Sequence, residues 1–82
     1  MSERIFHYNI CNQSDEELFK KQCAAIEKHI PHLRKSKILI DVDGSLFQEY
    51  MHSKGIIEVS NSHYINALYV DADFDLLPYF KK

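Results

Sequence analysis

The clearest pattern of apolar positions lies between residues 14 and 30. Phe19, Cys23, Ile26 and Ile30 follow one another at intervals of four, three and four residues, and between them stand the charged residues Lys20, Lys21, Glu27 and Lys28. This spacing places the apolar side chains along one side of an α-helix and the charged side chains on the other. The pattern therefore predicts one amphipathic helix over residues 14–30.

The ends of this helix carry their own signals. The segment Ser-Asp-Glu-Glu at 14–17 is typical of a capping box, in which the Ser14 hydroxyl accepts from the Glu17 amide and the Glu17 carboxylate reaches back. Pro31 ends or kinks a helix, because it has no backbone N–H to donate and its ring clashes with the preceding turn. We therefore expect the helix to begin at Ser14 and to stop before Pro31.

Residues 4–10 show a different pattern, in which apolar and polar side chains partly alternate. The segment is rich in aromatic and β-branched residues, which favours a β-strand. Its more apolar side is formed by Phe6, Tyr8 and Ile10, and we expect that side to face the core.

From residue 37 onward the apolar period becomes two, which again indicates strands. Residues 37–42 and 45–51 flank Asp43-Gly44, a strong signal for a tight β-hairpin. Further turns are predicted at 53–55 and 61–62. They bound strands at 56–60 and 63–70, and the tail at 75–80 either forms a short helical turn or lies across the core.

Two registers are possible for the first hairpin. A two-residue turn pairs Val42 with Ser45, whereas a type I turn followed by a glycine bulge pairs Asp41 with Ser45. We favour the second register because it places Lys37 opposite Glu49, which would give a cross-strand ion pair.

The order strand, helix and then four strands joined by short turns predicts an α+β fold. Short turns require antiparallel neighbours, so we expect a two-layer sandwich of a mainly antiparallel meander sheet and one capped helix, at about residues 14–30, packed on one face. Residues 1–82 form a single domain in this prediction. One helix cannot cover five strands, and part of the sheet must therefore stay exposed or meet another surface.

Composition narrows the possible functions. The chain has 82 residues and a formal net charge of −2, so we expect no nucleic-acid partner. No apolar run approaches the ~20 residues that cross a bilayer, and the beginning of the sequence does not resemble a signal peptide. We expect no membrane partner and a cytoplasmic location. Cys11 and Cys23 are too few and too far apart for a zinc knuckle or a redox pair, so we expect free thiols and no cofactor.

The segment Leu-Ile-Asp-Val-Asp-Gly-Ser-Leu at 39–46 resembles the first motif of the haloacid dehalogenase superfamily. The resemblance implies that Asp41 is a nucleophile, that Asp43 is an acid/base, and that magnesium binds beside them on a doubly wound parallel sheet. The residues that follow indicate antiparallel strands instead, and Asp-Gly is common in turns for conformational reasons alone. We favour a hairpin turn and no catalytic residues, with a small metal-dependent phosphotransfer or hydrolase-like protein as the alternative.

The last strand and the tail combine aromatic and acidic side chains. The candidate partner-binding residues are Tyr69, Asp71, Asp73, Phe74, Asp75, Tyr79 and Phe80. Aromatic anchors bordered by carboxylates suit a basic, groove-shaped target. In the plainer interpretation the aromatic side chains fill the core and the carboxylates point to water.

These observations favour a small non-enzymatic protein-binding module over an enzyme. Within that class we favour an immunity or antitoxin-type inhibitor that neutralises a basic partner protein such as a nuclease toxin. This is an analogy of type and not a match of sequence. The remaining alternative is a homo-oligomeric structural protein, for example a homodimer, in which copies pair through uncovered sheet faces or edges.

Overall fold

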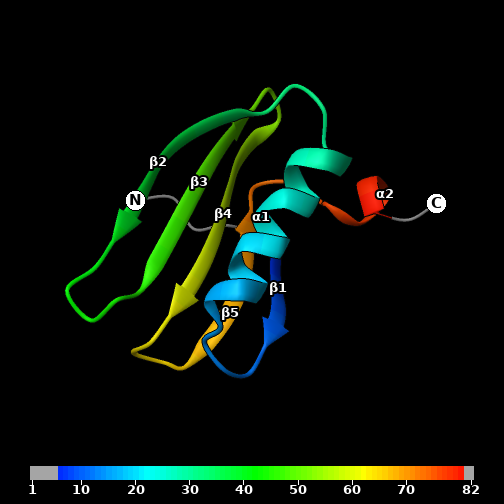
Figure 1. The fold of residues 1–82 in the computed structure, drawn as a ribbon. Helices are drawn as coiled ribbons and strands as arrows, with labels where there is room; N and C mark the ends of the chain where they lie inside the picture. The colour runs from blue at the N-terminus through cyan, green and yellow to red at the C-terminus, as the bar shows by residue number, and fades with distance from the viewer. Residues whose placement is uncertain (1–5, 81–82) are drawn as a thin grey trace.

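The computed structural model describes residues 6–80, with every side chain in that range except the one at position 37. The elements in chain order are β1 (Phe6–Cys11), α1 (Glu16–His29), β2 (Arg34–Ile40), β3 (Leu46–His52), β4 (Gly55–Ser62), β5 (Ala67–Ala72) and α2 (Leu77–Phe80). Figure 1 shows α1 lying across a twisted sheet. The predicted α+β fold with the order β-α-β-β-β-β is confirmed.

The described strands form one antiparallel sheet in the order β1-β5-β4-β3-β2. Strands β2 to β5 are a meander, and β1 pairs with β5. The first two strands of the chain are therefore the two edges of the sheet, and α1 connects one edge to the other. The helix packs mainly against β4, in the middle.

The core lies between α1 and the sheet. The predicted apolar stripe Phe19, Cys23, Ile26 and Ile30 is buried, as expected. On the sheet it meets the buried residues Tyr50, Ile57, Val59, Leu68, Val70 and Ala72. Because adjacent strand residues point to opposite faces, only every second residue of β3, β4 and β5 contributes to this core.

The helix begins one residue later than predicted. Asp15 has an extended backbone and is the N-cap, and its carboxylate accepts from the Leu18 amide at 3.1 Å. The capping box of Ser14 and Glu17 is therefore wrong. The Ser14 hydroxyl is instead hydrogen-bonded to the His63 ring at 2.9 Å, so a long-range contact replaces the local one. At the other end α1 stops before Pro31, as predicted.

One inward position in β1 also differs from the alternating pattern. Tyr8 packs against the core as predicted, but Ile10 does not and is 40% exposed. The strand register shifts between Asn9 and Cys11, so that Cys11 pairs with Leu68 and packs against the core. A bulge of this kind inserts one residue and reverses the alternation beyond it.

The hairpin between β2 and β3 has the register that we favoured. The Gly44 amide donates to the Asp41 carbonyl at 3.0 Å, and the Asp41 amide donates to the Ser45 carbonyl at 2.9 Å. Gly44 has φ +88°, a conformation that glycine adopts readily. Asp41 thus stands opposite Ser45, and Ile40 pairs with Leu46.

A second register shift lies in β2, between Lys35 and Ile38, and sets two residues of this strand against Glu49. Lys37 is one of the two. Its side chain lies outside the described residues, so its ion pair with Glu49 stays a prediction.

The last turn is displaced from its predicted position at 61–62. Strand β4 continues through these residues, and the chain turns at 63–66. Two asparagines explain the difference. The buried Asn61 uses its side-chain oxygen to accept from the amide of the helix cap at 2.8 Å, and Asn66 takes the left-handed conformation of the turn, with φ +50°.

The turn between β3 and β4 and the short helix α2 lie where the sequence predicted them. β3 and β4 meet at the predicted turn, where His52 pairs with Gly55, and α2 lies within the predicted helical turn at 75–80. Cys11 and Cys23 are free thiols. Within residues 6–80, neither helix is long and apolar enough to span a membrane.

Candidate partner-binding surface

The two faces of the sheet differ in what covers them. Within residues 6–80, both helices lie on the same side of the sheet. α1 packs on β4, and α2 lies beside the C-terminal end of α1, where the rings of His29 and Phe80 are 5.1 Å apart. We call the other side the open face. By strand register it carries His7, Asn9, Arg34, Leu39, Phe47, Glu49, Met51, Ile56, Glu58, Ser60, Tyr69 and Asp71.

A line of carboxylates crosses the open face. Glu49 of β3 stands opposite Glu58 of β4, and Glu58 stands opposite Asp71 of β5. We call these three residues the acidic row. Directly opposite residues have Cβ atoms only about 5 Å apart, and like charges at that distance oppose folding. His7 of β1 ends the row and is hydrogen-bonded to the Asp71 carboxylate at 2.5 Å.

Large apolar and aromatic side chains border the acidic row. Leu39 is 61% exposed and Met51 46% exposed, whereas Phe47 and Tyr69 are half-buried. The Tyr69 ring lies 5.2 Å from the ring of His7. Carboxylates among exposed apolar side chains give this face the mixed character of a protein-docking surface.

A shallow hollow of about 100 Å³ joins the acidic row to its apolar border. It is lined by Ser36, Leu39, Phe47, Glu49 and Glu58. Pockets for metabolites and cofactors usually enclose about 300–1,000 Å³. The hollow is therefore of a size to receive one side chain of a partner rather than a whole small molecule.

The structure divides the aromatic and acidic residues that were predicted from the tail. Tyr69 and Asp71 lie on the open face. Asp73 instead accepts from the Ile56 amide at 2.9 Å, and Asp75 accepts from the Tyr8 hydroxyl at 2.8 Å. These two carboxylates fasten the chain that leads from β5 to α2.

The remaining aromatic residues of the prediction pack at the end of the domain. Phe74, Tyr79 and Phe80 are partly buried against the core. The ring of Phe74 lies 4.9 Å from the ring of His52, which holds the tail against β3. The predicted residues thus do not form one continuous surface, and their role in binding stays a prediction.

Asp41 and Asp43 use their carboxylates inside the hairpin turn. Asp41 accepts from the Val42 amide at 2.7 Å, and Asp43 accepts from the Ser45 amide at 2.9 Å. The second hydrogen bond holds the pKa of Asp43 below its usual value. The strands on either side are antiparallel, unlike the parallel sheet that the haloacid dehalogenase resemblance implies. Elsewhere in residues 6–80, too, no cluster of three or more His, Cys, Asp or Glu side chains is arranged to hold a metal ion.

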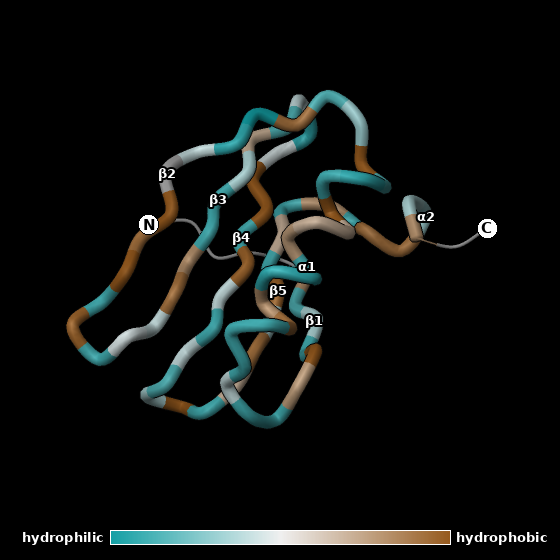
Figure 2. The backbone as a smooth tube through the Cα atoms, in the orientation of Figure 1, coloured by the Kyte–Doolittle hydropathy of each residue, from teal (hydrophilic) through white to brown (hydrophobic). Residues whose placement is uncertain are grey.

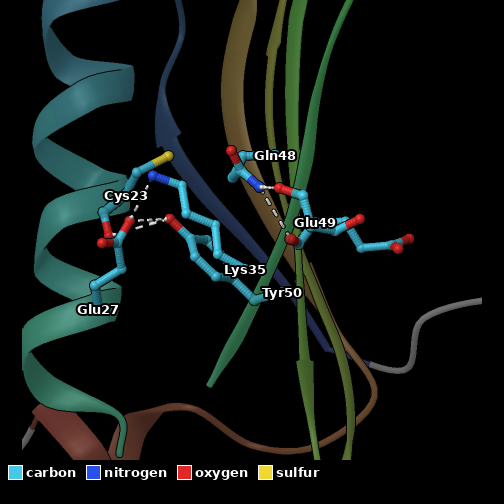
Figure 3. A network of polar contacts seen from close by, with 7 residues as sticks. Cys23, Glu27, Lys35, Gln48, Glu49 and Tyr50 are labelled. Atoms are coloured by element: carbon cyan, nitrogen blue, oxygen red, sulfur yellow. Dashed lines mark hydrogen bonds and ion pairs between the residues drawn. The ribbon is translucent and has the colours of Figure 1, made fainter. Parts of the chain in front are cut away.

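The helix side of the sheet holds a polar network, shown in Figure 3. The buried Tyr50 hydroxyl donates to the Glu27 carboxylate at 2.5 Å, and Lys35 pairs with the same carboxylate at 3.5 Å. Burial raises the pKa of Tyr50, so this hydroxyl stays protonated and remains a donor. The network therefore ties α1 to β3 and to β2.

Two further buried groups complete this region. Gln48 donates through its side-chain amide to the carbonyls of Ser36 and Glu49, at 2.7 and 3.0 Å, and so satisfies backbone groups beside the bulge of β2. Burial raises the pKa of the Cys23 thiol, which keeps it in the unreactive protonated form. These contacts stabilise the fold and do not resemble a nucleophilic site.

The sequence did not reveal the acidic row as a unit, because its members come from three strands and meet only through their register. A signal was present in Glu58, which stands at an outward position between the apolar residues Ile57 and Val59, and in Glu49, which stands opposite it. Comparisons with protein-family models, with curated proteins and with solved structures gave no match for this chain.

Proposed function

We propose that this protein is a small non-enzymatic protein-binding module whose open face docks on the basic surface of another protein. The observation that carries this proposal is the acidic row, bordered by exposed apolar side chains on a face that no described helix covers. A cationic partner supplies the charge that complements this row.

The gathering of three carboxylates on one face supports a functional reason for the acidic row. Like charges directly opposite each other on a sheet repel, so such pairs need compensating contacts. Asp71 has a contact of this kind with His7. Cationic side chains of a partner would add to this compensation, and the apolar border would add contact area.

The finer proposal concerns the class of partner. We propose that the partner is a nuclease toxin, whose basic, nucleic-acid-binding surface this protein would occupy as an immunity or antitoxin-type inhibitor. Tyr69 is a suitable aromatic anchor on the open face, since buried aromatic side chains often dominate binding energies. Asp71 beside it would then meet a basic side chain of the target.

A pair of matched variants tests the proposal. Glu49→Gln with Asp71→Asn neutralises two charges on the open face. Glu16→Gln with Glu17→Gln neutralises two exposed charges at the start of α1, on the other side. Each protein is used as bait in extract of the native cell, and each retained protein is then purified and titrated against all three baits at low and high salt.

We expect a basic protein that binds the wild type and the helix variant equally. Its association with the open-face variant should be about tenfold slower at low salt, and the difference should shrink as salt screens the charges. If that partner is a nuclease, the wild type should also inhibit its cleavage of DNA or RNA. Equal binding to the open-face variant would contradict the proposal.

A further inference from the structure

The edge strand β2 exposes an uninterrupted apolar segment. Ile38, Leu39 and Ile40 are 46%, 61% and 70% exposed, and Val42 in the following turn is fully exposed. Figure 2 shows the lower part of β2 as a hydrophobic band at the outer edge of the sheet, separated by a hydrophilic segment from the hydrophobic tip of the turn. An exposed apolar edge strand is a template for pairing with another strand.

The backbone of this strand is also prepared for pairing. The Asp41 amide is bonded to β3, through the Ser45 carbonyl. Because hydrogen-bonding directions alternate along an antiparallel strand, the amide and carbonyl of Leu39 also point to β3. The corresponding groups of Ile38 and Ile40 point away from the sheet, toward solvent.

The sequence around Leu39 is complementary to itself when it is read in the opposite direction. Residues 35–43 are Lys-Ser-Lys-Ile-Leu-Ile-Asp-Val-Asp. An antiparallel copy centred on Leu39 places each isoleucine opposite an isoleucine. It also sets position 37, a lysine, against position 41, an aspartate, at the two ends of the segment between the β2 bulge and the turn.

We propose that two copies of this chain form a dimer by antiparallel pairing of β2 with β2, about a two-fold axis at Leu39. Ile38 of one copy then faces Ile40 of the other, and their outward amides and carbonyls bond across the interface. A register centred on Ile38 sets Lys37 against Leu39, and one centred on Ile40 sets Asp41 against Leu39. Within residues 37–41, the register at Leu39 is the one of these three that leaves no charged residue opposite an apolar one.

This dimer has a defined shape. An axis through an antiparallel strand pair is perpendicular to the sheet, so the two open faces lie on the same side and the acidic row is doubled. On the helix side, Ile38 lines a groove of about 310 Å³ between α1 and the strands β2 and β3. The isoleucines of the second copy border that groove. The dimer is independent of the proposed function, although it would make the open face bivalent.

The small number of residues paired between the two β2 strands sets the expected affinity of the dimer. A few residues of one strand from each copy give an interface below the ~1,200 Å² of stable complexes, so the dimer should form in a concentration-dependent way. Sedimentation equilibrium of the full chain in a dilution series that reaches millimolar protein should show a reversible monomer–dimer equilibrium. A monomer at every concentration would overturn the proposal.

Two substitutions of exposed isoleucine locate the interface. Ile40→Lys places two like charges in the middle of the paired strands and should abolish the dimer. Ile65→Lys changes the same residue type in the turn 63–66, where it is 57% exposed, and should leave the dimer intact. Circular dichroism confirms that both variants are folded. A dimer that survives Ile40→Lys, or one that is lost in Ile65→Lys, would contradict pairing through β2.

A cysteine pair tests the register. In the proposed dimer Leu39 faces its own copy across a non-hydrogen-bonded position, with Cα atoms about 4.5 Å apart, within reach of a disulfide. Ile40 faces its copy only diagonally, beyond that reach. Mild oxidation should therefore give a covalent dimer of Leu39→Cys and not of Ile40→Cys, with the wild type and its native thiols as the blank. Faster cross-linking of Ile40→Cys would exclude this register.

Discussion

The two edge strands of the sheet, β1 and β2, differ in how far the rest of the chain covers them. β1 has a bulge after Asn9, and its Tyr8 hydroxyl donates to Asp75 and accepts from the Leu76 amide. The tail thereby ties down this edge. β2 has its bulge near its beginning, and the three residues from Ile38 to Ile40 continue as a regular, exposed and apolar strand.

The difference follows from where the chain places its few covering elements. α1 packs over the middle of the sheet, and the segment leading to α2 returns to the β1 edge. β2 is tied to the helix by the ion pair of Lys35 with Glu27, whose carboxylate also accepts from Tyr50 of the neighbouring strand β3. A small domain thus stabilises one part of the sheet by burial and leaves another part available for partners.

The largest expected effect comes from replacing isoleucine by alanine in the buried core, compared with the same replacement in the exposed strand β2. Ile26 is fully buried under the helix, and Ile26→Ala should lower the free energy of unfolding by about 2–5 kcal/mol because it leaves a cavity. Ile40 is 70% exposed, so Ile40→Ala should change the stability of the monomer by less than about 0.5 kcal/mol. Urea denaturation at low protein concentration measures both values.

Equal losses in these two variants would contradict the division between a buried and an exposed part. A large loss in Ile40→Ala that grows with protein concentration would have another meaning. It would report the dimer, since association stabilises the folded state by mass action.

The parts of the fold that the sequence predicted are those fixed by local chemistry. The spacing of Phe19, Cys23 and Ile26 defines a helix side wherever that helix packs, and Asp-Gly selects a tight turn by its own backbone preference. The remaining parts depend on distant partners. Ser14 leaves its capping role for His63, and Asn61 stays in β4 because its side chain serves the start of α1.

The candidate surface was harder to predict for the same reason. Its acidic row exists only through the pairing of β3, β4 and β5, and a shift of one residue would move Glu49 to the other face. The tail showed its aromatic and acidic residues clearly in the sequence. Their division between the open face and the fastening of α2 depends on contacts such as that of Tyr8 with Asp75.

A smaller effect is expected from loosening the attachment of β2 and β3 to the helix. Tyr50→Phe removes the hydroxyl that donates to Glu27 while the ring still fills the core. We expect the free energy of unfolding to fall by about 1–2 kcal/mol. The substitution removes a hydrogen bond to a charged group, and the partial exposure of the Glu27 carboxylate lets water replace part of it. Tyr64→Phe is the matched control, since Tyr64 is 89% exposed.

Hydrogen exchange sharpens this test. If the network fastens β2 as proposed, the amides of β2 should exchange faster in Tyr50→Phe, while those of β1 should change little. Equal acceleration at both edges would mean that the hydroxyl stabilises the whole domain and not the β2 side in particular.

The smallest effect concerns the turn that ends the β2 edge. The Ser45 amide holds the pKa of Asp43 below its usual value. The ionised carboxylate therefore favours the folded state above the pKa of unfolded aspartate, and this contribution disappears as the pH falls through the lower pKa of the folded state. Asp43→Asn should make the acid side of the stability curve slightly less steep, whereas Val42→Ala, a change in the same exposed turn, should not.

Because an asparagine oxygen can still accept from Ser45, the hairpin and the β2 dimer should persist in Asp43→Asn at neutral pH. If this substitution abolished partner binding instead, the turn itself would belong to the binding surface, and the comparison between the open face and the β2 edge would have to include it.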